Sequence, residues 1–321
     1  MTFKEFQEYI EAHILEGWKE DYKVELRKIR KNNGVELCGM FIRKEGDLTA
    51  PAIYLEDYYP WHLKGERTEK IIEKIRKAYD WMVPQLPSGQ LNVSHFECVR
   101  DRIVYRLVNY EKNKEILEEC PYLRLHDLAL TFRWVAHSDE IGISTALITN
   151  KELDAWGVTM HDILLAAKDN TERLFPPCVM EIAEVFQKIA EKRAQSRMAS
   201  GMRSIMESGM ESFPEFTPDS DIEMYIMTNE QGVNGAGVIL YDDYLKNFAR
   251  EHDEDFYILP SSIHEMILVP AGNIDSPSGF FEMVRDVNET VVSLGDILSD
   301  SVYYYDRKEN RIIPLKQEEY I

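Results

Sequence analysis

The sequence is poor in the residues that build metal and disulfide sites. Its 321 residues include only four cysteines, Cys38, Cys98, Cys120 and Cys178, and no two of them form a CxxC pair. The eight histidines show no ligand spacing either. Zinc knuckles and disulfide frameworks need such pairs. The sequence therefore predicts neither, and we expect no bound metal and no cofactor.

Long apolar runs are also absent. Uninterrupted apolar stretches are only a few residues long, whereas a transmembrane helix needs roughly 20. The first residues, MTFKEFQEYIEAHILEGW, carry acidic side chains at every turn and lack the charged and then apolar layout of a signal peptide. We therefore expect a cytoplasmic protein without a membrane span.

Positive charge is scarce in the last third of the chain. The formal net charge of -20 is uneven, since residues 1–84 hold 15 Lys and Arg against 16 Asp and Glu, whereas residues 205–321 hold 7 against 24. A surface of this kind repels a phosphate backbone and attracts cations. It predicts a basic protein as partner and argues against direct nucleic-acid binding.

What the chain does contain is enough apolar material to fill folded cores. Hydrophobic residues make up 44%, aromatic residues 11% and charged residues 29%, which is typical of a globular protein. The length exceeds the usual size of a single core. Turn-rich segments and shifts in composition predict domains at 1–86, 87–195 and 223–321, with a Ser-, Gly- and Met-rich linker at 196–222.

Local patterns predict an α+β fold with mainly antiparallel sheets. A helix begins after Thr2, and a hairpin turns at Asn33-Gly34. A second hairpin spans 127–149, followed by a helix that opens at Thr159. A strand leading into a helix is expected within 233–248. The predicted architecture is an N-terminal helix-and-hairpin unit followed by two hairpin-helix units.

The segment FYILPSSIHEMILVP, residues 256–270, contains the candidate catalytic residues. They are Ser261, Ser262, His264 and Glu265. If residues 263–269 form a strand, His264 and Glu265 point to opposite faces and cannot hold one metal or substrate atom together. Serines after a proline are typical of turns, so we interpret the segment as structural. Glu265 is the exception, because its carboxylate needs either a basic partner or a raised pKa suited to acid catalysis.

The linker contains a candidate partner-binding surface. Its methionines recur every four residues, at Met198, Met202, Met206 and Met210, with basic residues nearby. On a helix they would form an adaptable apolar stripe of the kind that binds partner helices or acidic lipid. The same stripe could instead pack on the protein's own core, and the neighbouring glycines weaken an isolated helix.

Five phrases of the sequence together resemble one family. They are LVNYEKNKEIL (107–117), HDLALTF (126–132), WGVTMHDILLAAKDNTERLFPP (156–177), GAGVILYDDYL (235–245) and ILPSSIHEMILVP (258–270). In this order they are similar to the bacterial family known as domain of unknown function 5688, found in anaerobic Firmicutes. The resemblance implies a shared scaffold that includes the PSSIHE and NTERLFP turns, and it implies no reaction.

Three functional hypotheses follow from these patterns. The leading one is a binding or regulatory protein whose acidic last third contacts a basic partner. The second is a hydrolase-type enzyme that uses Glu265 or His264 with Ser261 or Ser262, and a pocket with converging polar groups would favour it. The third is an acidic mimic that occupies the nucleic-acid groove of another protein, and a row of exposed carboxylates would favour that.

Overall fold

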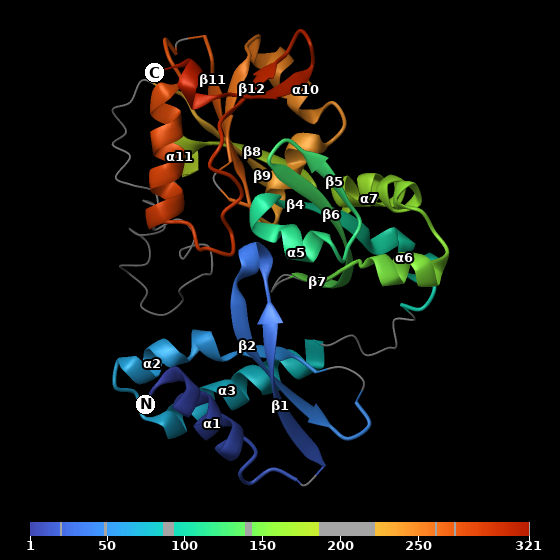
Figure 1. Ribbon diagram of the computed structural model, residues 1–321, viewed down its shortest axis with the longest axis vertical. Helices are drawn as coiled ribbons and strands as arrows, with labels where there is room; N and C mark the ends of the chain where they lie inside the picture. Colours follow the sequence, from blue (N-terminus) through green and yellow to red (C-terminus); the bar gives the residue numbers. More distant parts are fainter. Residues whose placement is uncertain are drawn as a thin grey trace. The chain divides into compact units, whose positions relative to one another are not determined.

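The computed structural model describes residues 1–19, 21–47, 50–85, 93–138, 143–185, 222–260, 262–272 and 274–320 (Figure 1). The chain forms two compact units, Met1–Leu91 with Ala136–Ser144, and Asn92–Val135 with Thr145–Ile321. The fold is α+β, and the strand pairings with a described register are antiparallel. Residues 196–221 of the predicted linker, and with them Met198, Met202, Met206 and Met210, lie outside the described residues.

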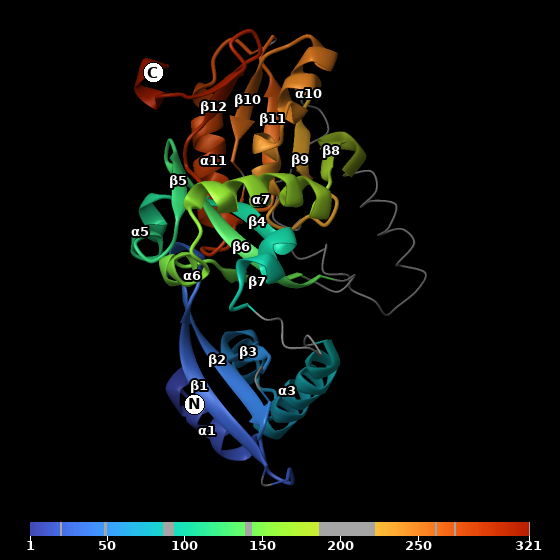
Figure 2. The same ribbon diagram turned by 90° about the vertical axis from the view of Figure 1, so that its right-hand side faces the viewer.

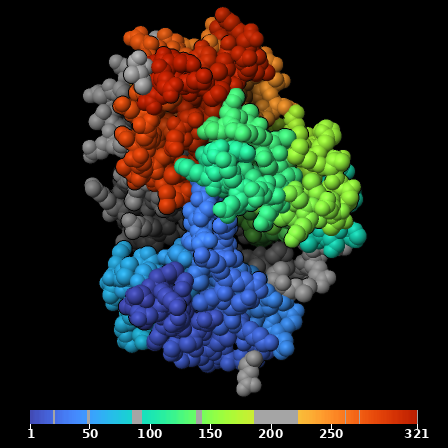
Figure 3. All heavy atoms as spheres, in the orientation of Figure 1, coloured from blue at the N-terminus to red at the C-terminus, as the bar shows by residue number. Residues whose placement is uncertain are grey.

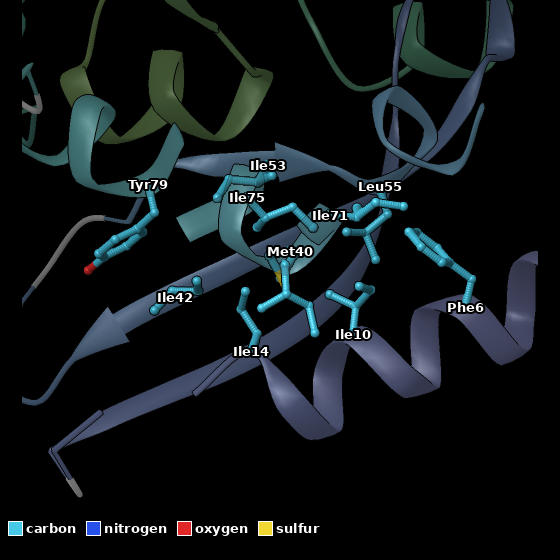
Figure 4. Close-up of a cluster of buried hydrophobic side chains, with 11 residues drawn as sticks. Phe6, Ile10, Ile14, Met40, Ile42, Ile53, Leu55, Ile71, Ile75 and Tyr79 are labelled. Atoms are coloured by element: carbon cyan, nitrogen blue, oxygen red, sulfur yellow. The ribbon is translucent and has the colours of Figure 1, made fainter. Parts of the chain in front are cut away.

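The N-terminal unit places helices against one face of a three-stranded sheet of order β1-β2-β3. Its elements are α1 (Phe3–His13), β1 (Tyr22–Arg30), β2 (Glu36–Lys44), β3 (Ala52–Tyr54), α2 (Tyr59–Leu63) and α3 (Thr68–Met82). Figure 4 shows the core of this unit, where Phe6 and Ile10 of α1 meet Met40 of β2 and Ile71 and Ile75 of α3. Burial of this apolar cluster drives the packing of helix on sheet.

Two local signals in this unit are confirmed. The Thr2 hydroxyl accepts the N–H of Glu5 at 3.3 Å, and the Glu5 carboxylate accepts the N–H of Thr2 at 2.7 Å, which is a capping box at the start of α1. Asn33 and Gly34 have positive φ angles of 57° and 70° in the turn between β1 and β2. Asn and Gly tolerate this left-handed backbone, as the tight hairpin requires.

The larger unit contains two sheets. A four-stranded sheet has the order β4-β6-β5, with β7 paired to β6, and a six-stranded sheet has the order β13-β12-β10-β11-β9-β8 (Figure 2). The strands are β4 (Ile103–Asn109), β5 (Tyr122–Leu125), β6 (Leu128–Ser138), β7 (Ile143–Leu147), β8 (Pro177–Glu181), β9 (Tyr225–Asn229), β10 (Phe256–Leu259), β11 (Met266–Pro270), β12 (Tyr303–Asp306) and β13 (Arg311–Pro314). The hairpin expected within 127–149 is formed by β6 and β7.

Helices cover both faces of the six-stranded sheet. The helices of this unit are α4 (Phe96–Val99), α5 (Lys114–Leu117), α6 (Asn150–Trp156), α7 (Met160–Leu174), α10 (Tyr244–His252), α11 (Ser278–Thr290) and the 3-10 helix η6 (Gly235–Leu240). Phe280, Phe281 and Val284 of α11 pack on one face. On the other, Phe248 of α10 contacts the ring of Phe256. The α7 helix begins with the expected capping box of Thr159.

Two expectations for the second half of the chain are wrong. The β11 strand begins at Met266 rather than at residue 263, because the hydroxyl of Ser262 holds the intervening residues in a turn. The strand expected within 233–248 is instead η6, which begins after the left-handed Asn234, with φ 54°. Residues 235–239 of η6 are all buried. Their apolar run therefore reflects burial and not strand formation.

Candidate functional site

The candidate catalytic residues lie in the turn between β10 and β11. Ser262 is buried, and its Oγ accepts the N–H of His264 at 3.0 Å and donates to Glu265 Oε1 at 2.9 Å. A serine hydroxyl that bonds the backbone two residues ahead is a common turn device. Ser261 falls at a position that the structure does not describe. Ser262, His264 and Glu265 are thus brought together, although in a turn and not along a strand.

Both ring nitrogens of His264 face a partner. The backbone N–H of Asn234 donates to Nδ1 at 3.1 Å, and Nε2 lies 3.5 Å from Asp296 Oδ1. Because Nδ1 accepts, the neutral ring carries its proton on Nε2, toward Asp296. The carbonyl of His264 also accepts the hydroxyl of Thr228 at 2.7 Å. The His264 side chain therefore joins η6 and the loop before β12 to the β11 turn.

Gly235 shows how tightly this joint is packed. A Cβ atom at Gly235 would lie 2.2 Å from Thr228 Oγ1, 2.5 Å from the carbonyl oxygen of His264 and 2.8 Å from the N of Asn229. Two of these three atoms belong to the backbone and cannot turn away. Only glycine fits at the start of η6, so Gly235 allows the close packing of η6 on β9 and the β11 turn.

Hydrogen bonds keep the carboxyl of Asp296 ionised despite its partial burial. Burial acts to raise the pKa of its carboxyl, but hydrogen bonds from His264 and from the Ser293 hydroxyl at 2.6 Å outweigh burial, and the charge of Arg106 adds to them. The net effect lowers the pKa of Asp296, which therefore stays ionised at neutral pH.

Arg106 of β4 adds a buried positive charge beside this cluster. Its Nε is buried and has no hydrogen-bond partner among the described residues, and Nη1 lies 3.5 Å from Asn234 Oδ1. Burial lowers the pKa of Arg106, and repulsion from Arg133 lowers it further, whereas Asp296 opposes the shift. The guanidinium remains charged at neutral pH. Asp296 thus supplies countercharge to Arg106 and lies within 3.5 Å of the His264 ring.

The turn places a hydroxyl beside a carboxylate, away from the two surface pockets. The Ser262 hydroxyl donates to Glu265 Oε1 at 2.9 Å, so a base lies within its reach, whereas it contacts the backbone of His264 and not its ring. Two surface pockets have volumes of about 660 and 510 Å³, and neither is lined by Ser262, His264 or Glu265. Across the described ranges, no three His, Cys, Asp or Glu side chains gather as a metal site would require.

Sequence reasoning assigned no role to Asp127, which collects three hydroxyl groups. In the tight turn between β5 and β6, its Oδ2 accepts Ser299 Oγ at 2.5 Å and Ser301 Oγ at 3.0 Å, and its Oδ1 accepts the Tyr303 hydroxyl. Burial is the main cause that raises the pKa of Tyr303, and the charge of Asp127 adds to it. Tyr303 therefore stays neutral and keeps donating. The cluster ties the β5–β6 turn to the segment that enters β12.

The exposed side of α11 carries a row of unpaired carboxylates. Glu282, Asp286 and Glu289 are exposed, and none of them forms an ion pair within 4.0 Å with a described residue. We call these three residues the acidic face of α11. The basic residue between them, Arg285, donates instead to Gln317 Oε1 at 2.9 Å. Figure 3 shows the orange atoms of α11 open to view on this side of the larger unit.

Most of these residues were missed in the sequence for one physical reason. Arg106 and Asp127 bond partners more than a hundred residues away, and Asp296 meets His264 from 32 residues further along the chain, and no local pattern marks such pairs. The acidic face could have been predicted, because Glu282, Asp286 and Glu289 follow the spacing of four and three residues that places side chains on one side of a helix.

Comparison with known proteins gives one match. A model described as a family of unknown function (DUF5688) matches residues 3–307. No curated protein and no solved structure matches the chain. No helix within the described part of the chain is long and apolar enough to cross a membrane.

Proposed function

The chain belongs to the family of unknown function DUF5688, and we propose from its surface chemistry that it is a cytoplasmic binding protein that contacts a basic partner through the acidic face of α11. The wider surface supports this choice of partner. Within residues 222–320 the sequence holds 19 Asp and Glu against 7 Lys and Arg. Such an excess attracts cationic surfaces and steers their approach.

The observation that carries the proposal is the position of the three carboxylates. The first turn of α11 contains no acidic residue and its last turn no basic one, whereas Glu289 lies in that last turn. A helix favours the reverse, with acids near its N-terminus and bases near its C-terminus. Glu282 and Asp286 also repel each other at i and i+4. Arg285, three residues after Glu282 and four before Glu289, offsets the repulsion but not the position of Glu289 at the C-terminal end. A basic partner would relieve the remaining penalty, and a feature that breaks a local rule is a candidate for function.

Charge density favours a plain binding surface over a nucleic-acid mimic. Glu289 is seven positions after Glu282, so the row spans about 10 Å at 1.5 Å per residue. A duplex presents one negative charge per about 1.7 Å of its axis, or about six over the same length. Three carboxylates reach half that density. The mimic hypothesis therefore needs acidic groups beyond α11.

A titration with a fluorescent oligolysine peptide tests the proposal. The test variant is Glu282→Gln/Asp286→Asn/Glu289→Gln. The matched control, Glu69→Gln/Glu73→Gln/Asp80→Asn, removes the same charge from exposed positions of α3. Exposed ion pairs contribute about 0.2–1 kcal/mol each, so the test variant should lose about tenfold in affinity at low salt. The control should bind like the wild type.

Two outcomes would contradict the proposal. Equal losses in the two variants would mean that only net charge matters and that α11 is no specific surface. An affinity that does not fall between low salt and about 0.15 M would show that the contact is not electrostatic, because the screening length there is about 8 Å.

A further inference from the structure

A second surface of the larger unit has the shape and chemistry of a small-molecule site. A pocket of about 510 Å³ lies between the β5–β6 turn, the segment that joins η6 to α10, and the β12–β13 hairpin. Sites for small ligands are usually about 300–1,000 Å³. The pocket shares no residue with the acidic face of α11 or with the Ser262–Glu265 turn.

The walls of this pocket are apolar. Ile239, Leu245 and Tyr305 line it with 7%, 4% and 2% of their surface exposed, and the half-buried Ile312 adds a further side chain. The hydroxyl of Tyr305 donates its hydrogen bond within the protein, to Asn310 Oδ1 at 2.7 Å. A ligand body that enters here therefore gains by burying apolar surface.

The unpaired charge at the rim is positive, although the chain as a whole is acidic. Asp242 is paired with Lys168 at 2.6 Å, and Asp243 with Lys246 at 3.0 Å. Arg311 lines the same pocket, is exposed, and forms no ion pair within 4.0 Å among the described residues. The group left to attract a ligand is thus a guanidinium.

Left-handed backbone also occurs at the rim of this pocket. Six non-glycine residues of the described chain have positive φ, and three of them line this pocket: His126 with φ 57°, Asp243 with 54° and Asn310 with 48°. His, Asp and Asn are the non-glycine residues that adopt this backbone most readily, and tight hairpin turns require it. The three residues therefore shape the turns that form the rim of the pocket.

We infer that the pocket binds a small ligand that consists of an apolar body and one carboxylate. The carboxylate lies on Arg311, whose planar guanidinium offers two parallel donors to such a group. The apolar body lies against Ile239, Leu245 and Ile312. A free aliphatic acid and the C-terminal residue of a peptide both present this chemistry. The inference goes beyond the proposed contact at α11, because the site, the ligand and the sign of its charge all differ.

Titrations of the full chain with three probes of equal chain length test the inference. Octanoate should bind more tightly than 1-octanol, and octylamine should bind least. The variant Arg311→Gln should lose about tenfold in octanoate affinity and leave 1-octanol unchanged, since a hydrogen-bonded charge pair is removed. Lys308→Gln is the matched control, because Lys308 is an exposed cation of the same hairpin turn that does not line the pocket. Arg311→Glu should reverse the preference to octylamine.

Peptide probes distinguish the two sources of the carboxylate. A short peptide that ends in leucine should compete with octanoate, and its C-terminal amide should not. If the peptide binds more tightly than octanoate, the natural ligand is a peptide end, and if it binds more weakly, the ligand is a free acid. Octanoate binding no tighter than 1-octanol, or equal losses in Arg311→Gln and Lys308→Gln, would overturn the inference.

Discussion

Removing the charges of the acidic face of α11 should stabilise the protein while it removes binding. In Glu282→Gln/Asp286→Asn/Glu289→Gln, two like-charge pairs disappear together with the attractions of Arg285 for Glu282 and Glu289, and these four terms of about 0.2–0.5 kcal/mol each nearly cancel. The variant also removes the negative charge of Glu289 from the last helical turn, where such a charge costs about 0.3–1 kcal/mol. Glutamine and asparagine keep nearly the helix propensity of the residues they replace. The free energy of unfolding should therefore rise by about 0.5 kcal/mol, and the Tm by about 1–2 °C.

Thermal unfolding followed by circular dichroism measures this gain. At low salt the triple variant should melt above the wild type, and in about 1 M salt, where the screening length falls to about 3 Å, the two should coincide. Glu69→Gln provides the opposite case. Glu69 is an acid in the first turn of α3, so its neutralisation should lower the Tm. A triple variant that melts at or below the wild-type Tm in low salt would refute the reasoning, because the carboxylates would then carry no local penalty for a partner to relieve.

Three further predictions concern the scaffold of the larger unit. Asp127→Asn weakens three hydroxyl hydrogen bonds of about 0.5–1.5 kcal/mol each, so the free energy of unfolding in urea should fall by about 2–4 kcal/mol. An unchanged unfolding midpoint would contradict a stabilising role for these hydrogen bonds. In the same assay, Gly235→Ala should lower the free energy of unfolding by about 3 kcal/mol, because the new Cβ meets backbone atoms. Gly279→Ala is the control and should not lower it, because open space surrounds that position. Equal losses in the two variants would contradict the close packing at Gly235. Burial raises the pKa of Tyr105, Tyr241 and Tyr303 above the value of about 10 in the unfolded chain. Above that pH the unfolded state loses protons that the folded state keeps, so stability should fall by about 1.4 kcal/mol per pH unit for each tyrosine, and a flat profile up to about pH 11 would count against their burial.

Much of the fold could be predicted because its signals are local. Thr2 and Thr159 each satisfy a helix start through an acid three residues ahead, so a few sequence letters suffice to place α1 and α7. The Asn33-Gly34 turn is equally predictable, because Asn and Gly are the residue types that adopt the positive φ angles of a tight hairpin.

The failures have two physical causes. The β11 strand begins later than predicted because the Ser262 hydroxyl bonds His264 and Glu265 and holds them in a turn, which no strand pattern marks. The apolar run of η6 reflects burial, which is why it resembled a strand. For the candidate site, Ser262, His264 and Glu265 could be found as neighbours, but Asp296, which contacts the His264 ring, and Arg106, whose charge acts on Asp296, come from other segments.

The proposed contact at α11 can be located directly by hydrogen–deuterium exchange. The full chain would be compared with and without the oligolysine peptide at low salt. If the acidic face of α11 holds the basic partner, added peptide should slow exchange within Ser278–Thr290, and the triple neutral variant should show no such change. Slowed exchange in the N-terminal unit with none in α11 would contradict the account.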